Sequence, residues 1–275
     1  FSFPSQAFWL RTMNRTVLLR LLFAAGIRHA AALAPPVLAS LFGESGCPDT
    51  IAFIFETLVP TEKALGEIMR VDWTPFGNAY YITKECGGVP APAGCSTSST
   101  CLYNSSVREC YFSHCGLGGH PKFDDCFGPG SIHCQHGSVE CFANQIEACI
   151  KVSNPAGSWT ISRCIEKAFY SGTLRNGKSS DEEITKVAKD CGATDEVLTA
   201  CAGQLGHEAL VAMAQATPPH PGVPYILVDG TPLSDETQLL DAVCKAYKGQ
   251  KPDKCLKAAL PSLESFLTVP KISRS

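Results

Sequence analysis

The stretch from Pro36 to Phe55 reads PVLASLFGESGCPDTIAFIF, and it decides the expected fold. An apolar run ends in a glycine-rich turn, and Pro48 then favours the first turn of a helix. Cys47 therefore lies where a strand gives way to a helix. Free backbone N–H groups and the helix dipole at that position stabilise a thiolate over a thiol. We expect Cys47 to be an exposed, ionised and reactive thiol.

The residue three positions after Cys47 is Thr50. A dithiol exchange site places its second cysteine there, so this chain has half of such a motif. The Thr50 hydroxyl could donate a hydrogen bond to the Cys47 sulfur and favour the anion, while an ionised Asp49 would oppose it. The sequence leaves the balance between these two effects open.

The cysteine content points to an oxidising compartment. The chain has 275 residues, 45% of them hydrophobic, a net charge of −3 and 15 cysteines. Its length allows one domain with insertions or two small domains. A reduced cytosolic protein does not usually carry so many cysteines, and their spacing of mostly eight to ten residues argues against zinc. With all others after residue 80, Cys47 is the cysteine expected to stay unpaired.

The rest of the sequence argues against a nucleic-acid-binding protein and against a membrane span after the N-terminal segment. No basic run is present, so a nucleic-acid partner has no electrostatic support. From Met13 a charged start, a short apolar core and an alanine-rich stretch ending at Ala34 predict a signal peptide over 13–34, with an amphipathic segment as the alternative. Residues 1–12 form an upstream extension of unclear status. No later stretch is long enough to span a bilayer, and Asn104 begins a glycan acceptor motif.

Periodicity and turn residues predict the order of the elements. We expect the first helix to reach Leu58 and to be interrupted by Pro60. Asp229-Gly230 is the strongest hairpin signal. The other expected elements are helices over 61–69, 181–189, 194–200, 205–216 and 234–248, the last capped by Ser234, a helical region over 139–175, and strands over 71–76 and 225–228.

The stretch 82–133 differs in character from the rest. It is rich in Gly, Pro and Ser and has too few aliphatic residues to build a core. We expect three bridges to hold it together as a loop-rich insertion. A metal knot of His114, Cys115 and His120 is the alternative. The insertion cysteines are Cys86, Cys95, Cys101, Cys110, Cys115 and Cys126.

One segment resembles a known family. Residues Cys134 to Cys149 read CQHGSVECFANQIEAC, which is similar to the signature of gamma-interferon-inducible lysosomal thiol reductases. Pro75-Phe76-Gly77-Asn78-Ala79 and the stretch from Val223 to Cys255 resemble two further family segments. The resemblance covers about residues 36–256, apart from the insertion, which is longer than the family leads us to expect.

The resemblance implies a fold and a domain plan. The fold is α/β, a thioredoxin-like β-α-β and β-β-α core over 35–256 with insertions at 82–133 and at 134–216, the second helical, and 257–275 form a tail. The candidate structural disulfide cysteines are Cys134, Cys141, Cys149, Cys164, Cys191, Cys201, Cys244 and Cys255.

The resemblance also implies a chemistry. Family members are secreted or endolysosomal enzymes that reduce protein disulfides at acidic pH through a pair of cysteines. By position the nucleophile is Cys47, Thr50 replaces the resolving cysteine, and Pro224 matches the cis-proline that faces the thiol. The implied partners are disulfide-bonded or unfolded proteins and a small-thiol reductant, with no cofactor. We interpret His136 as structural rather than catalytic, and leave open whether His220 approaches the site.

Three functions therefore remain. The first is a single-thiol disulfide reductase or isomerase, in which an external thiol releases the mixed disulfide on Cys47. The second is a redox-impaired binder or chaperone of unfolded chains, which would bind them beside Pro224. The third is a secreted, disulfide-rich structural protein whose function lies in residues 82–133.

Overall fold

The computed structural model describes residues 34–86, 105–115, 121–128 and 132–258. Several expectations lie outside these residues: the upstream extension and nearly all of the predicted signal peptide, Cys95, Cys101, Asn104, His120 and most of the C-terminal tail. The described chain from Pro35 onward belongs to one compact unit. None of its helices is both long and apolar enough to cross a lipid bilayer.

A four-stranded mixed sheet forms the centre of this unit, with strand order β2-β1-β5-β6. β1 (Val37–Gly43) pairs in parallel with β2 (Met69–Pro75), from Val37 opposite Met69 to Gly43 opposite Pro75. On its other side β1 pairs antiparallel with β5 (Tyr225–Val228), which pairs with β6 (Thr231–Pro232). The expected β-α-β and β-β-α order of a thioredoxin-like fold is confirmed.

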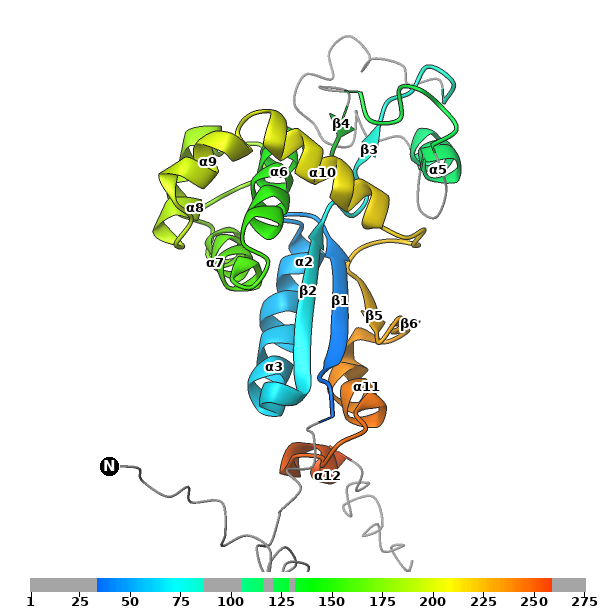
Figure 1. Ribbon diagram of the computed structural model, residues 1–275, viewed down its shortest axis with the longest axis vertical. Coiled ribbons are helices and arrows are strands. Elements are labelled where there is room, and N and C mark those ends of the chain that lie inside the picture. The colour runs from blue at the N-terminus through cyan, green and yellow to red at the C-terminus, as the bar shows by residue number, and fades with distance from the viewer. Residues whose placement is uncertain (1–33, 87–104, 116–120, 129–131, 259–275) are drawn as a thin grey trace, which may run out of the picture. The chain divides into compact units, whose positions relative to one another are not determined.

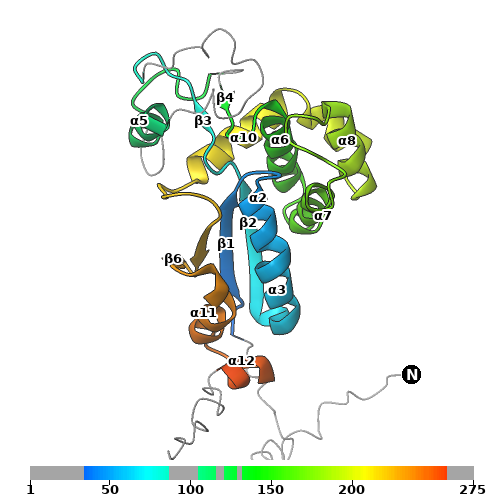
Figure 2. The ribbon, with the colours of Figure 1, turned by 180° about the vertical axis from the view of Figure 1, so that it is seen from behind.

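The connection between β1 and β2 is one continuous helical segment. It consists of α2 (Pro48–Phe53), a π-helical turn η1 (Ile54–Leu58), α3 (Val59–Leu65) and the short 3-10 turn η2 (Gly66–Ile68). The expected break at Pro60 is wrong. Proline lacks a backbone N–H, and the π-helical turn directly before it changes the hydrogen-bonding pattern so that the helix can continue. Figures 1 and 2 show α2 and α3 running along the sheet.

Five helices that follow β4 and precede β5 in the sequence form a separate layer. They are α6 (Ser138–Ser153), α7 (Ser158–Tyr170), α8 (Asp181–Asp190), α9 (Asp195–Cys201) and α10 (Gln204–Ala216). Figure 1 shows them gathered at the end of the sheet where β1 and β2 finish. This is the end that carries Cys47, so the helices form the surroundings of the thiol.

The stretch 82–133 contributes to the core, contrary to expectation. A helix that the sequence did not predict, α5 (Ser105–Cys115), packs against β3 (Tyr80–Tyr81), which pairs with β4 (Ile132–His133). Tyr111 on α5 is fully buried in the same core as Tyr81. Aromatic rings and disulfides replace the aliphatic residues that this stretch lacks.

The C-terminal part follows the prediction except at its last long helix. Asp229 and Gly230 both have positive φ, 46° and 78°, as a tight two-residue hairpin requires. The expected helix from Ser234 instead begins as a 3-10 turn η3 (Glu236–Gln238) and continues as α11 (Leu239–Ala246). Asp235, not Ser234, caps it, because its side chain accepts a hydrogen bond from the backbone N–H of Thr237 at 3.0 Å. A last helix, α12, spans Asp253–Ala258.

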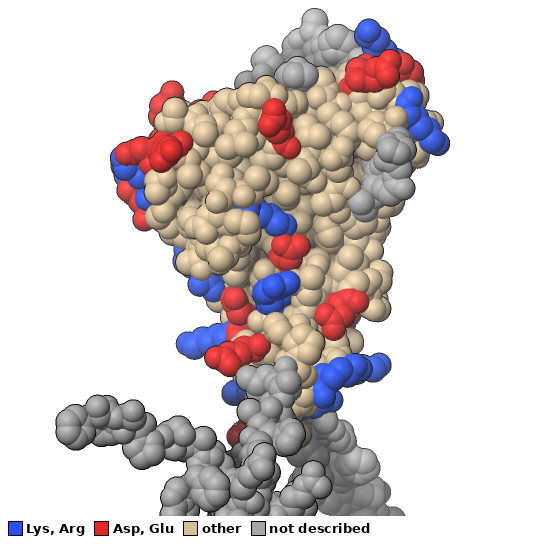
Figure 3. Space-filling view, in the orientation of Figure 1, with Lys and Arg blue, Asp and Glu red and all other residues tan. Residues whose placement is uncertain are grey.

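Charged residues of both signs are distributed over the face shown in Figure 3. Acidic and basic side chains lie close to one another there, and a broad area between them is uncharged. This face therefore offers no extended basic surface of the kind that nucleic-acid backbones require.

Candidate functional site

Cys47 is the N-cap residue of α2, at the end of the short loop that follows β1. Its N–H donates to the carbonyl of Glu44 at 3.2 Å, and its own carbonyl accepts from the N–H of Ile51 at 2.9 Å. Gly46 takes a positive φ of 69°, and a Cβ there would lie 2.5 Å from the ring of Phe169. The loop therefore needs glycine directly before the thiol.

The thiol is free but buried, which corrects the expectation of an exposed anion. Cys47 is 4% exposed and forms no disulfide. The pKa of Cys47 is raised from its ordinary value of 9.0 to about 11. Burial is the main cause and the charge of Glu44 adds to it, while the backbone N–H groups of Thr50 and Asp49 act in the opposite direction. The helix N-terminus does stabilise the anion as expected, but desolvation is the larger effect.

Thr50 lies beside the thiol and is fully buried. Its hydroxyl also lowers the pKa of Cys47, although Oγ1 makes no hydrogen bond of full geometry. The acidic residue that opposes the Cys47 anion is Glu44, which precedes the thiol, and not the exposed Asp49.

A histidine and a buried carboxyl group lie next to Cys47, and a second buried carboxyl group contacts the histidine. Ligand atoms of Glu44, Cys47 and His136 all lie within 4.8 Å of one another. Glu140 holds His136 in place, because its Oε2 contacts Nδ1 at 2.5 Å and accepts the His136 backbone N–H at 2.9 Å. Our interpretation of His136 as structural missed its proximity to the thiol. The i,i+4 spacing of His136 and Glu140 was the available signal, whereas no pattern in the sequence pointed to Glu44.

A second pair of buried carboxyl groups fixes the loop before the thiol. Glu147 accepts a hydrogen bond from the Ser45 hydroxyl at 2.7 Å and another from Trp73 Nε1 at 2.7 Å. Burial raises the pKa of both Glu147 and Glu166, and the neighbouring charge of Glu147 raises that of Glu166 further. Asn144 Oδ1 accepts the Ser45 N–H at 2.8 Å. Asn144 and Glu147 belong to the segment from Cys134 to Cys149 that resembles the family signature, and they therefore anchor this loop.

Pro224 borders the same pocket as the helix that begins at Cys47. The Val223–Pro224 peptide bond is cis, and the two residues line a pocket together with Asp49, Phe53 and Glu236 among others. Pro224 therefore lies beside α2 across this pocket, and its role opposite the thiol stays a prediction.

His220 connects this proline loop to the site. Its Nε2 accepts from Arg108 Nη2 at 2.8 Å and lies 3.2 Å from Asn78 Oδ1. The backbone N–H of Asn78 in turn donates to Glu44 Oε1 at 2.8 Å. Burial lowers the pKa of His220 to about 4, so the ring is neutral. The sequence left open whether His220 approaches the site of Cys47. In the structure His220 is connected to that site indirectly, through Asn78 and Glu44.

The other described cysteines form disulfides. The bridges are Cys86–Cys110, Cys115–Cys126, Cys134–Cys141, Cys149–Cys201, Cys164–Cys191 and Cys244–Cys255. The alternative of a metal knot around His114 and Cys115 is not supported, because the Cys115 sulfur is in a bridge.

Three comparisons place this geometry among known proteins. The family model of gamma interferon inducible lysosomal thiol reductase (GILT) matches residues 38–128 and 119–191, more than half of the chain. A gamma-interferon-inducible lysosomal thiol reductase of Mus musculus is 27% identical over 232 residues, covering 82% of this chain and 74% of the relative. Its counterpart in Carassius auratus is 26% identical over 238 residues, covering 81% and 73%.

Solved structures match this chain at lower sequence identity. Reduced DsbG of Mycobacterium tuberculosis has a TM-score of 0.48 at 14% identity, covering 82% of this chain and 86% of that chain. MdbA, a thiol-disulfide oxidoreductase of Actinomyces oris, has a TM-score of 0.45 at 9% identity, covering 79% and 83%.

Proposed function

The chain belongs to the gamma interferon inducible lysosomal thiol reductase family, and from this premise we propose that it is a thiol-disulfide oxidoreductase that acts on protein disulfides through the single thiol of Cys47. The observation that carries the proposal is the position of Cys47. It is the free cysteine of the described chain, at the N-terminus of α2, where that helix and cis-Pro224 border a common pocket.

The first step is attack by Cys47 on a substrate disulfide. The Cys47 sulfur forms a bond to one substrate sulfur, the substrate S–S bond breaks, and the electron pair leaves with the second substrate sulfur. A buried thiol with a raised pKa needs a nearby base for this attack. His136 has a ring nitrogen within 4.8 Å of the sulfur. We assign it the role of the base, which takes the Cys47 proton after a small movement or through one water and passes it to the departing thiolate.

The second step needs thiols from outside the chain. Thr50 has no sulfur and cannot resolve the mixed disulfide. A small thiol instead attacks the Cys47 sulfur of the mixed disulfide, forms a new disulfide with Cys47 and releases the bound substrate sulfur as the second substrate thiol. Another molecule of the reductant then attacks that new disulfide and frees Cys47. The net reaction converts one substrate disulfide and two small thiols into two substrate thiols and one small disulfide.

Family membership supports a place in the endolysosomal or secretory lumen. We propose that residues 13–34 direct the chain there as a signal peptide and that Asn104 carries a glycan. Six disulfides among the described residues fit an oxidising route of maturation.

The burial of Cys47 favours one second candidate. A thiol that is 4% exposed and has a pKa of about 11 is also what a redox-impaired protein would keep. Such a protein would bind unfolded chains beside Pro224 without reducing them.

Turnover of a disulfide-bonded protein with a small-thiol reductant separates the two candidates. We expect reduction by the wild type, no reduction by Cys47→Ala, and a large loss for His136→Ala. His207→Ala is the matched control, because this partly buried histidine of α10 packs on Tyr81 instead. Substrate binding without any turnover in the wild type would favour the binder, and equal turnover in Cys47→Ala would exclude the single-thiol mechanism.

A further inference from the structure

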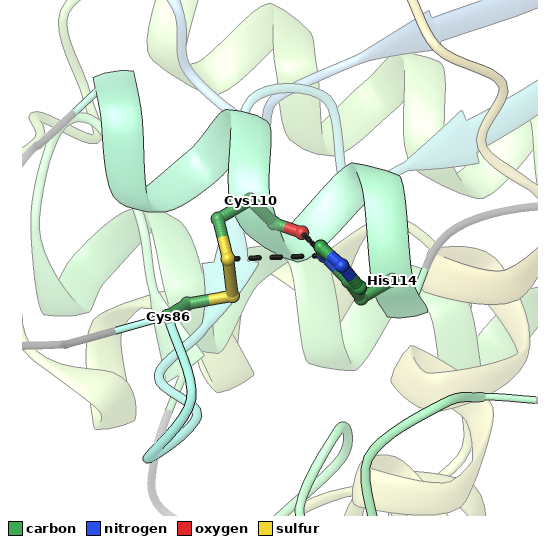
Figure 4. A group of neighbouring side chains, drawn as sticks. All are labelled: Cys86, Cys110 and His114. Atoms are coloured by element: carbon green, nitrogen blue, oxygen red, sulfur yellow. Dashed lines mark hydrogen bonds between the residues drawn. A yellow bond between two sulfur atoms is a disulfide. The ribbon is translucent and has the colours of Figure 1, made fainter.

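Two groups of side chains in the described parts of the chain bring three metal-binding atoms together. One is Cys86, Cys110 and His114. Its two sulfurs are joined in a disulfide, and His114 Nδ1 is 2.9 Å from the carbonyl oxygen of Cys110, as Figure 4 shows. A metal needs thiolates, so this group cannot bind one while the bridge is intact.

The second group is Glu44, Cys47 and His136, and it keeps its thiol. Each member lies on a different part of the fold: Glu44 follows β1, Cys47 caps α2, and His136 precedes α6. Their ligand atoms lie within 4.8 Å of one another. In a tetrahedral zinc site, bonds of about 2.0 to 2.3 Å place neighbouring ligand atoms about 3.3 to 3.8 Å apart, so small side-chain movements close the group around an ion.

One atom of this group independently indicates a missing ligand. Glu44 is fully buried, and its Oε1 accepts the Asn78 N–H at 2.8 Å. The other oxygen, Oε2, makes no hydrogen bond and lies 3.6 Å from His136 Nδ1. An ionised oxygen in this buried position without a hydrogen bond is costly, so the ionised form of Glu44 needs a partner such as a cation at Oε2.

We propose that Cys47 Sγ, a ring nitrogen of His136 and Glu44 Oε2 form a Zn²⁺ site. A sulfur, an imidazole nitrogen and a carboxylate oxygen suit a divalent ion of borderline softness. Glu140 contacts His136 Nδ1 and orients the ring, as carboxylates commonly do for metal-binding histidines. A water completes the four ligands.

The ion also fits the charges around it. A Cys47 thiolate and an ionised Glu44 would bring two negative charges into a buried region, where the cationic groups that act on Glu44 are His136 and Arg108. On binding, the S–H bond breaks, the sulfur bonds to the metal and the proton leaves to solvent. Coordination lowers the nucleophilicity of the sulfur, so the ion would slow attack on a disulfide and hold the thiol in reserve until it is removed.

Binding can be measured without any turnover, using the full chain after treatment with a chelator and dialysis. Titration with Zn²⁺ should show one ion per chain, and Co²⁺ should give a thiolate-to-metal charge-transfer band together with the absorption of a tetrahedral ion. Both should be lost in Cys47→Ala. Glu140→Gln should weaken binding by about 10- to 100-fold, because it removes the support of the ring.

Two controls keep the test independent of folding and of the proposed reaction. His114→Ala should bind as tightly as the wild type, because the disulfide group does not contribute. In the unmutated chain, Zn²⁺ should block alkylation of Cys47 and a chelator should restore it. No stoichiometric binding, a Co²⁺ spectrum without the thiolate band, or unchanged binding in Cys47→Ala would overturn the proposal. Metal binding without turnover would refute the proposed function alone.

Discussion

The protonation of Glu140 should make the fold more stable in acid than at neutral pH. Glu140 is fully buried beneath His136, and its two oxygens accept the backbone N–H groups of Gln135 and His136 at 3.1 and 2.9 Å. Burial raises its pKa from 4.5 to about 8. The folded chain therefore holds a proton that the unfolded chain releases at much lower pH, and stability falls as the pH rises through this interval.

The size of the effect follows from this shift. At pH 5 the folded carboxyl is protonated and the unfolded one is mostly ionised, while at pH 8 the folded carboxyl is about half ionised. Linkage converts this difference into a loss of about 3.5 kcal/mol of unfolding free energy between the two pH values. The pKa values of Glu44, Glu147 and Glu166 are also raised by burial, so their contributions have the same sign.

The matched variants are Glu140→Gln and Glu67→Gln, the second at an exposed surface position. The amide that Glu140→Gln introduces cannot titrate but has one acceptor oxygen for two N–H groups, so this variant should lose about 1–3 kcal/mol of unfolding free energy at pH 5. Its stability should then change by about 3.5 kcal/mol less than that of the wild type between pH 5 and pH 8. Glu67→Gln should follow the wild type.

Urea unfolding at a series of pH values, followed by circular dichroism with the disulfides intact, measures these differences. The slope against pH is the decisive quantity, because it does not depend on the hydrogen bond that the variant loses. An equal slope in Glu140→Gln and the wild type would show that this carboxyl is ionised in the folded chain at pH 5, and the reasoning about burial would be wrong.

Three further predictions concern the sulfur chemistry. The rate of Cys47 alkylation should keep rising with pH up to about 11, where the pKa of Cys47 lies. Glu44→Gln should shift this rate–pH profile to lower pH. A wild-type profile that levels off near pH 8 would contradict the raised pKa that burial causes. Thr50→Cys should form a disulfide with Cys47 and raise turnover, since an internal thiol then resolves the mixed disulfide; two free thiols under oxidising conditions would place Thr50 outside the resolving position. Replacing Cys149 and Cys201 together by alanine should lower the unfolding free energy by about 4 kcal/mol in urea titrations, because the bridge spans a sequence separation of 52; a loss below about 1 kcal/mol would argue against this loop-closure effect.

Local sequence signals were sufficient for the sheet and for most of the helices. The apolar run that ends at Gly43, Pro48 in a first helical turn and Asp229-Gly230 in a hairpin each act over a few residues. The failures came from longer-range effects. A π-helical turn accommodates Pro60 within a continuous helix, and Tyr111 secures α5 through aromatic contacts with Tyr81, among others.

The candidate site was only partly predictable for a related reason. The place of Cys47 at a strand-to-helix junction follows from its neighbours in sequence. Its burial and the resulting rise in its pKa do not, because they depend on helices that follow it by about a hundred residues. The proximity of His136 likewise requires the fold to bring two distant segments together.

The most direct test of the single-thiol account is to trap the covalent intermediate. The wild type, incubated with a disulfide-bonded protein and quenched in acid before reductant is added, should yield a mixed disulfide that mass spectrometry of the peptides assigns to Cys47. Cys47→Ala should yield none, and His207→Ala should yield as much as the wild type. A substrate sulfur found on another cysteine, or no adduct on Cys47 at any pH at which the substrate binds, would contradict the account.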